Sequence, residues 1–443
     1  MTAVSNATIG ESIRIPEVLD PGQMSAPCLV LDVDLTETIP SIAPPRLGEP
    51  RCTWVLSRNG REMLGAVVLA IPRSGISALD LESALRMHFA AELASAEDRP
   101  ASVGDGSSCD GAGGRLADDM AVVVCTRERP EGLERCLMSL LKQSCQPARI
   151  IVVDNAPRTD ASRLVVDSLG SPLITYVVEP VPGLSRARNR AIAESGGCGI
   201  LAWIDDDEVA DFRWLERIAE AFSEVPDAVA VSGPMLPAQL ETWAQVRFEQ
   251  YGGHSKHRGF DRAVFRTSDV GSQPPLYPLP PFGTGGNMAI RRDALLEIGG
   301  FDVHLGAGTP AMGGEDTKAF TQLLIDGGTV VYQPSAATFH YHRRDDEALL
   351  QQMYGYGAGL TAFYTSVVMS SSASVVSLGR LIPRFLRDVT GRKSLRSGHL
   401  PPDFPAALRA ANRNGLVVGP YRYLEGRRNT RARAPAQPGP SGD

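Results

Sequence analysis

Four short apolar runs alternate with helix-patterned segments through the middle of the chain, and this alternation constrains the fold more than any other feature. The apolar runs cover residues 120–125, 149–154, 173–178 and 199–205, and the helix-patterned segments cover 131–142, 160–168 and 184–194. Strands that are apolar along their whole length need cover on both faces. Because strands and helices alternate at the spacing of βαβ units, the sequence predicts an α/β domain with a parallel sheet.

The flanking segments differ from this domain in composition. Residues 1–100 mix short β-like runs with one helical stretch, and residues 101–117 are rich in Gly, Ser and Asp. Such a segment buries too little apolar surface to order itself. We therefore predict a small N-terminal α+β module of unknown function (1–100), a flexible linker (101–117), the α/β domain (118–345), a helical C-terminal region (346–426) and a disordered Pro-, Gly- and Arg-rich tail (427–443).

The charge balance bears on the partners of the protein. A net charge of -7 argues against a general nucleic-acid binder, because affinity for the phosphate backbone requires clustered Lys and Arg. From Arg380 onward, however, arginines outnumber acids, and this region either suits an anionic membrane surface or is a solvated basic tail. No apolar run reaches the roughly 18 residues that a membrane helix needs.

Cysteine usage and the first residues bear on the compartment. The seven cysteines are scattered and contain no CxxC pair, which favours a reducing environment. The first residues show neither the basic start nor the apolar stretch of a signal peptide. We expect a cytoplasmic protein, with peripheral contact at the inner face of the membrane as an open alternative.

Four consecutive acids, Asp205 to Glu208, follow the apolar run at 199–205. In open parallel sheets, ligands bind at the carboxyl ends of the strands. Adjacent carboxylates raise one another's pKa unless a cation compensates, and Mg²⁺ or Mn²⁺ prefers carboxylate oxygens. Asp205 and Asp207 would face the same side, leaving Asp206 for another group such as a ribose. The alternative is a solvated helix N-terminus, where acids are also favoured.

Three further segments carry polar groups suited to a ligand. Arg186, Arg188 and Arg190 open a helix and could hold a diphosphate, or they could form an exposed basic face. Residues 282–288 are rich in glycine, which permits a ligand to approach the backbone closely. Glu315 and Asp316 follow a second glycine-rich loop; one of them could take a proton from a hydroxyl, or both could simply cap the helix.

A late histidine pair, His340 and His342, follows the β-like residues 336–339. Imidazole is an acceptable ligand of Mn²⁺, so one of the two histidines could complete the coordination shell of a metal ion. A structural histidine is the alternative.

The order of these motifs resembles the family 2 glycosyltransferases with the GT-A fold. The motifs are Thr126-Arg127, Asp154-Asn155, GLSRARNRAI from Gly183, WIDDD from Trp203, FGTGGNMA from Phe282 and GGED from Gly313. The resemblance covers residues 118–342 and implies a Rossmann-like, three-layer α/β/α domain with a mostly parallel central sheet. It leaves residues 1–100 and the C-terminal region unexplained.

The resemblance also implies a role for each matching residue. The donor would be a nucleotide-diphosphate sugar bound by Thr126, Arg127, Asp154, Asn155, Arg186, Arg188, Asp205, Asp206, Gly285, Gly286 and Asn287. A divalent metal, Mn²⁺ or Mg²⁺, would be held by Asp205, Asp207 and His342, with His340 as the alternative to His342. Asp316 would be the catalytic base, and Glu315 would hold the acceptor or a metal-bound water.

These roles describe an inverting transfer to an acceptor hydroxyl. No QxxRW element follows Asp316 and no membrane spans follow it, so we expect one transfer per encounter and not a processive polymer synthase. The acceptor is open, with a lipid-linked or cell-envelope glycan as a hypothesis. A nucleotidyltransferase of related fold and a noncatalytic nucleotide-sugar-binding scaffold are the rival interpretations.

Overall fold

The computed structural model describes residues 14–97, 116–255, 258–270, 279–370 and 400–433. The chain forms two compact units, one comprising residues 1–104 and 240–246 and the other comprising 105–239 and 247–443. Most of the predicted linker and the residues after 433 lie outside the described residues.

The first unit is built on a four-stranded sheet in the order β1–β4–β3–β2. Its elements are β1 (Val18–Leu19), a short 3-10 turn (Pro21–Gln23), β2 (Leu29–Asp34), β3 (Cys52–Asn59), β4 (Glu62–Ala70), α1 (Ala78–His88) and α2 (Ala90–Glu97). β3 pairs parallel with β2 and antiparallel with β4. Leu81 and Leu85 of α1 pack on Val55 of β3, and all three are fully buried. This core gives the module its own α+β fold.

The second unit is built on an eight-stranded sheet in the order β12–β14–β10–β13–β8–β5–β6–β7. The strands are β5 (Met120–Thr126), β6 (Arg149–Asn155), β7 (Ile174–Glu179), β8 (Ile200–Asp205), β10 (Ala228–Ser232), β12 (Ala263–Phe265), β13 (Asn287–Arg291) and β14 (Thr329–Tyr332). Only β12 and β13 run against the other six strands. The sheet is therefore mostly parallel, as the sequence predicts.

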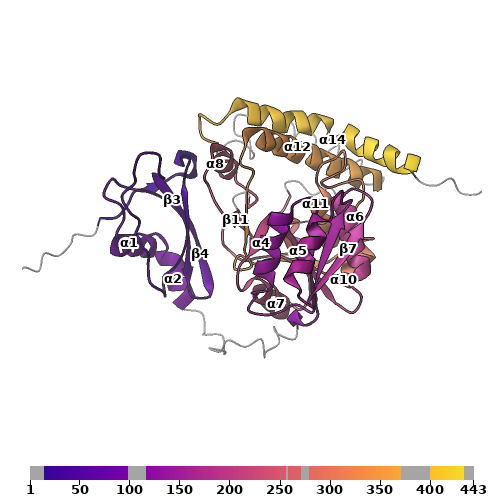
Figure 1. Ribbon diagram of the computed structural model, residues 1–443, viewed down its shortest axis with the longest axis horizontal. Helices are drawn as coiled ribbons and strands as arrows, with labels where there is room; N and C mark the ends of the chain where they lie inside the picture. The colour runs from indigo at the N-terminus through magenta and orange to yellow at the C-terminus, as the bar shows by residue number, and fades with distance from the viewer. Residues whose placement is uncertain (1–13, 98–115, 256–257, 271–278, 371–399, 434–443) are drawn as a thin grey trace, which may run out of the picture. The chain divides into compact units, whose positions relative to one another are not determined.

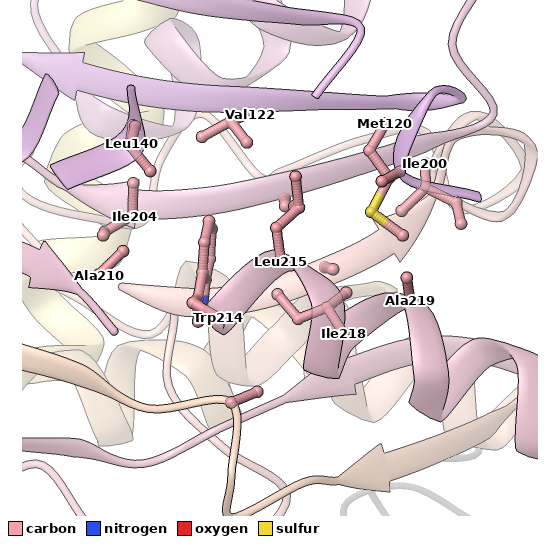
Figure 2. Packing of buried hydrophobic residues seen from close by; sticks show 14 of the residues in the cluster. Met120, Val122, Leu140, Ile200, Ile204, Ala210, Trp214, Leu215, Ile218 and Ala219 are labelled. Carbon is pink, nitrogen blue, oxygen red and sulfur yellow. The ribbon is translucent and has the colours of Figure 1, made fainter. Parts of the chain in front are cut away.

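Helices cover both faces of this sheet, which explains why its strands are apolar along their whole length. One face packs against α4 (Pro130–Leu140), α5 (Ala161–Leu169) and α7 (Trp214–Glu224). The other face packs against α6 (Leu184–Glu194), α10 (Arg292–Glu297) and α11 (Glu315–Ile325). Figure 2 shows Trp214, Leu215 and Ile218 of α7 among the strand residues of the first face. The predicted three-layer α/β/α fold class is confirmed.

Shorter elements complete the second unit beside the main sheet. β9 (Glu208–Ala210), β11 (Met235–Pro237) and β15 (Thr338–His340) form a small sheet in the order β11–β15–β9. The remaining helices before the C-terminal region are α8 (Trp243–Gln250), which belongs to this unit from Arg247 onward, and α9 (Thr267–Val270). Because β9 directly follows β8, the small sheet extends from the carboxyl end of a central strand.

The C-terminal region is a helical hairpin of α12 (Asp346–Ser370) and α14 (Ala406–Arg433), which run side by side in Figure 1. Gly357 and Gly415 face each other across the pair, and a Cβ on either residue would collide with the opposite backbone. α14 continues to Arg433, so helical structure reaches into the segment predicted as a tail from residue 427. Among the described helices, none combines the length and the apolar character that crossing a bilayer requires.

The hairpin also contacts the loop that leads into α11. Gly314, which precedes α11 with a φ of 89°, packs on the backbone of Gly359 in α12, where a Cβ on Gly314 would lie 2.5 Å from the Gly359 carbonyl oxygen. Side chains strongly disfavour a positive φ, and the contact leaves no room for one. The start of α11, with Glu315 and Asp316, is thereby held against α12.

Candidate functional site

The carboxyl ends of three neighbouring parallel strands bring the predicted polar residues to one edge of the sheet. β5 lies between β6 and β8, with Thr126 opposite Asp154 and Cys125 opposite Asp205. The run from Asp205 to Glu208 leaves the sheet at this edge and leads into β9. The expectation that the residues after the strands would gather there is met for these positions.

Asp206 is turned inward among fixed partners. It is 4% exposed and accepts hydrogen bonds from Thr126 Oγ1 at 2.8 Å and from Arg129 Nη1 at 3.0 Å. Burial, reinforced by the charge of Asp207, raises the pKa of Asp206, while Arg129 opposes the rise. Asp206 and Thr126 are therefore hydrogen-bonded to each other, and both keep little hydrogen-bonding capacity for a ribose.

Asp207 presents its two oxygens to different groups. Oδ2 accepts a hydrogen bond from Arg129 Nη1 at 2.8 Å and lies 3.6 Å from Arg343 Nη2, whereas Oδ1 lies 3.4 Å from His340 Nε2. Burial acts to raise the pKa of Asp207, but His340, Arg129 and Arg343 together hold it well below its usual range. Asp207 is therefore ionised, with Oδ1 on the histidine side.

Asp205 and Glu208 form the other half of the acidic cluster. The Asp205 side chain is 36% exposed, and burial together with Asp207 raises its pKa, opposed by Arg188. Glu208 is 1% exposed; Thr338 Oγ1 donates to its Oε2, and its Oε1 has no hydrogen-bond partner among the described residues. Burial, with the nearby charge of Asp205, raises the pKa of Glu208. Buried and unpaired carboxylate oxygens are the setting in which a cation is stabilising.

The glycine-rich segment joins this cluster to Asp316. Gly286 packs on Asp205 and Glu208, since a Cβ there would collide with Glu208 Oε1 and lie 2.9 Å from Asp205 Oδ2. The backbone N–H of Gly285 donates to Asp316 Oδ2 at 2.8 Å. Two adjacent glycines therefore contact the acidic cluster on one side and the predicted base on the other.

Arg188 and Glu315 lie in the interior, next to the two glycines Gly285 and Gly286. Arg188 is 1% exposed; it donates to Glu315 Oε1 at 2.9 Å and to the Gly285 carbonyl at 3.0 Å, and it lies 3.8 Å from Asp205 Oδ1. Burial, with Asp316 nearby, raises the pKa of Glu315, although Arg188 opposes the rise. The guanidinium of Arg188 is thus engaged with protein groups, and Glu315, 6% exposed, is less accessible than the half-buried Asp316.

The residues predicted to bind the base and the ribose differ in which hydrogen-bonding atoms remain available to a ligand. Asp154 is fully buried; Tyr176 donates to its Oδ2 at 2.8 Å, and its Oδ1 has no partner among the described residues. Asn155 is occupied, since it donates to the Val181 carbonyl at 2.9 Å and accepts from Gly183 N–H at 2.8 Å. Arg127, directly after β5, is half-buried. Asn155 orders the loop before α6, whereas Asp154 keeps an acceptor oxygen.

Asn287 lies away from the surface at the start of β13. Its side chain is fully buried, donates to the Pro234 and Ala336 carbonyls at 2.9 and 2.8 Å, and accepts from Trp214 Nε1 at 2.9 Å. All of these partners are protein groups, so Asn287 ties the main sheet to α7 and to the turn before β15.

Arg186 lines a cavity of about 640 Å³ on the far side of the α6 start. The cavity walls come from the loop before α6, from the loop 303–310 and from the end of α14, which contributes Gly426, Asn429 and Thr430. Arg186 and Arg188 point into different environments, because residues two apart on a helix do not share a face.

The histidines meet at the edge of the small sheet. His340 and His342 are 4% and 3% exposed, and their Nδ1 atoms lie 2.7 Å apart. His342 Nε2 contacts Glu249 Oε1 at 2.7 Å, and burial lowers the pKa of His342 against the opposing effect of Glu249. With His254 they form a group whose ligand atoms all lie within 4.8 Å of one another. Imidazole and carboxylate groups together fit a transition-metal ion such as Mn²⁺.

Sequence reasoning missed several residues of this site. Arg129 bridges Asp206 and Asp207 from the residue before α4, and Glu208, His254 and Glu249 complete the acidic and histidine clusters. Glu208 is the last of the four consecutive acids, and Arg129 lies two residues after Arg127, so both could have been considered from the sequence. No sequence pattern marks Glu249, in α8, or His254, in the turn after it, because this segment reaches the site only through the tertiary fold.

A three-layer sheet with acidic residues and glycines gathered at the carboxyl ends of its parallel strands defines the class of GT-A glycosyltransferase domains. Residues 121–299 match the family Glycosyl transferase family 2. For these residues the match agrees with the resemblance inferred from the motifs.

Two curated relatives carry the same domain. The glucosyl-dolichyl phosphate glucuronosyltransferase of Haloferax volcanii is 28% identical over 194 residues, 42% of this chain and 57% of that protein. The succinoglycan biosynthesis protein ExoM of Rhizobium meliloti is 33% identical over 221 residues, 48% of this chain and 63% of that protein. The chain thus spans about three fifths of the length of the relatives that it matches.

A solved structure with similar architecture is the mannosyltransferase PcManGT from Pyrobaculum calidifontis in complex with GDP-Man and Mn²⁺. It is 15% identical, with a TM-score of 0.46, and the match covers 76% of this chain and 96% of that one.

Proposed function

We propose that this chain is a metal-dependent, inverting glycosyltransferase that makes a single transfer from a nucleotide-diphosphate sugar to an acceptor hydroxyl. The observation that carries the proposal is the junction at Gly285 and Gly286, which contacts Asp316 on one side and Asp205 on the other. A leaving group held by the acidic cluster and an acceptor activated by Asp316 would meet there.

The donor nucleotide would lie along the carboxyl ends of β5 and β6. Asp154 Oδ1, buried and with no hydrogen-bond partner in the described parts of the chain, suits an N–H donor of a base. Arg127, half-buried after β5, suits the ribose or a phosphate. Asn155 and Asn287 support the surrounding loops in this assignment, because their side chains are already bonded to the protein.

A divalent ion would be held by Asp205 and Asp207 with an imidazole of the pair His340 and His342. Such an ion supplies charge stabilisation to the departing diphosphate. Arg129 holds Asp207 in place from the opposite oxygen. Arg188 keeps Asp205 and Glu315 in a fixed arrangement beneath the donor site.

Asp316 would perform the proton transfer. Its Oδ2 accepts from Gly285 N–H, which orients the carboxylate toward the junction, and its exposure is greater than that of Glu315. Asp316 takes the proton of the acceptor hydroxyl while that oxygen bonds to the anomeric carbon and the bond to the nucleoside diphosphate breaks. Attack from the face opposite the leaving group inverts the anomeric centre.

A nucleotide-sugar screen tests this function directly. In the presence of Mn²⁺ we expect one nucleotide-diphosphate sugar to raise the melting temperature, because a ligand at 100 times its Kd adds about 2.7 kcal/mol to the free energy of unfolding. With an acceptor, we expect release of nucleoside diphosphate and an inverted linkage by NMR. Release of pyrophosphate would identify a nucleotidyltransferase, and binding without turnover on any acceptor would identify a scaffold.

The exposed face of α14 supports a membrane-associated acceptor. Val417, Tyr421 and Leu424 are 79%, 61% and 37% exposed at helical spacing, and the exposed Arg413 and Arg428 lie at either end of this stripe. Apolar side chains flanked by arginines fit an anionic lipid surface. We propose that this face lies on the membrane and that the acceptor is lipid-linked, in keeping with the substrate named for the Haloferax relative.

Vesicle sedimentation checks the membrane contact. We expect the protein to sediment with phosphatidylglycerol vesicles and much less with phosphatidylcholine vesicles, because the arginines contribute electrostatic attraction. Tyr421→Glu should reduce the bound fraction severalfold. The matched control is Leu296→Glu, another exposed apolar position, on α10, which should bind as the wild type does. Failure of the wild type to bind anionic vesicles would contradict the proposal.

A further inference from the structure

Four side chains form an unbroken line from the acidic cluster into the protein. Asp207 Oδ1 lies 3.4 Å from His340 Nε2, His340 Nδ1 lies 2.7 Å from His342 Nδ1, and His342 Nε2 lies 2.7 Å from Glu249 Oε1. The two imidazoles are almost completely buried, so water does not separate these contacts. The line begins at the residue before β9 and ends on α8, far apart in the sequence.

The contacts fix where the protons lie when both imidazoles are neutral. A neutral imidazole carries one N–H, and the other nitrogen is an acceptor. His342 Nε2 must donate to the Glu249 carboxylate, so His342 Nδ1 is an acceptor. Two lone pairs cannot approach to 2.7 Å, and the proton between the rings therefore belongs to His340 Nδ1. His340 Nε2 is left with a lone pair that points toward Asp207 Oδ1.

A nitrogen lone pair facing a carboxylate oxygen needs a cation between the two: either a proton on His340 Nε2, which makes the contact an ion pair, or a metal ion that takes the proton's place. The other oxygen of Asp207 is bonded to Arg129, so Oδ1 is the one available on this side. Two ligands at right angles on an octahedral ion lie about 3 Å apart, and the observed 3.4 Å is close to that spacing. Carboxylate oxygen and neutral imidazole nitrogen are both ligands of Mn²⁺.

We propose that His342 and Glu249 are positioning residues that select the tautomer of His340, so that His340 Nε2, opposite Asp207 Oδ1, is the imidazole nitrogen available to the divalent metal of the proposed function. The proposal rests on the proposed metal-dependent function and assigns His342, predicted above as a ligand, to the position behind the ligand. Partners of this kind orient a ligating histidine and raise its basicity, and their loss typically weakens metal binding about 10–100-fold.

The three-histidine arrangement is the competing metal site. It would place one ion among His254, His340 and His342. If the facing Nδ1 atoms of His340 and His342 were both ligands of that ion, their separation of 2.7 Å would be shorter than the about 3 Å between neighbouring ligands. Phe248, whose ring centroid lies 4.8 Å from that of His342 and 4.9 Å from that of His254, packs edge-on against both rings and resists their separation.

Mn²⁺ binding to the full chain tests the proposal without any turnover measurement. The free Mn²⁺ signal in electron paramagnetic resonance gives the Kd, and electron spin echo modulation reports ¹⁴N atoms bound to Mn²⁺. We expect one imidazole coupling in the wild type that disappears in His340→Ala. Glu249→Gln and His342→Ala should each raise the Kd by about 10-fold or more while retaining the coupling.

Matched variants separate positioning from folding. Glu224→Gln removes an exposed carboxylate, and His88→Ala removes an exposed imidazole, and both should keep the wild-type Kd. Melting temperatures in EDTA identify any variant that fails to fold. The proposal is overturned if Glu249→Gln binds Mn²⁺ with a Kd within twofold of the wild type, or if His254→Ala loses the imidazole coupling. If the wild type transfers no sugar while the variants change the Mn²⁺ affinity as expected, only the proposed function is contradicted.

Discussion

Asp316→Asn is expected to lower the rate of sugar transfer by about 10²–10⁴-fold, the range that a general base contributes. The asparagine oxygen can still accept the Gly285 N–H, so the loop and the fold should be preserved. The variant loses the ability to take a proton from the acceptor hydroxyl, and it also loses the hydrogen bond that Asp316 Oδ1 accepts from Thr317 N–H at 2.6 Å, so its melting temperature is measured beside its turnover. Transfer is measured as release of nucleoside diphosphate, and nucleotide-sugar affinity, measured by calorimetry, should stay near the wild-type value because Asp316 faces the acceptor side.

Asp326→Asn is the matched control for this prediction. Asp326 is an exposed carboxylate at the opposite end of α11, bonded only to Gln322 among the described contacts. Its replacement should leave turnover unchanged. If Asp316→Asn retained turnover within tenfold of the wild type, another group would be the base. Glu315→Gln would then be the next variant to measure, although Glu315 is nearly buried and bonded to Arg188.

The main sheet could be predicted because its signals are local. Strands covered on both faces are apolar at every position, so β5, β6, β7 and β8 stand out as continuous runs and α4 to α6 as periodic segments between them. Of the β11–β15–β9 sheet, only β15 was anticipated, as the β-like residues 336–339, because each strand spans only three residues and pairs with distant partners. Short strands leave little pattern in the sequence.

The site could be predicted in position but only partly in detail. Acids after a buried strand place the ligand edge, since parallel strands bring their carboxyl ends together. The direction in which each side chain turns depends on tertiary partners. Asn287 sits in a glycine-rich motif, yet three protein groups occupy its amide. Arg129 pairs with acids 77 and 78 residues away, a contact that no local pattern reveals.

Arg188→Met is expected to reduce the free energy of unfolding by about 3–5 kcal/mol, the cost of breaking a buried ion pair by removing one partner. Methionine fills similar volume but leaves the Glu315 carboxylate and the Gly285 carbonyl without their donor. Urea unfolding gives the value. Arg190→Met on the same helix is the matched control, because its ion pair with Glu194 is exposed and should contribute less than about 1 kcal/mol.

The pH dependence and a second substitution identify Glu315 as the source of this loss. Without Arg188, the pKa of Glu315 rises further, because burial and Asp316 already raise it and Arg188 is the largest influence that lowers it. A carboxyl group whose folded pKa lies above its unfolded value of about 4.3 loses stability as the pH rises through the folded pKa. Because the pKa of Glu315 is already raised to about 7 in the wild type, the deficit of Arg188→Met should widen as the pH rises above 7, where Glu315 ionises in the wild type but stays protonated in the variant. Adding Glu315→Gln to Arg188→Met should recover part of the lost stability, since a neutral amide needs no counter-charge. A deficit that does not depend on pH and is unchanged in the double variant would show that Arg188 stabilises the fold by packing and not by charge.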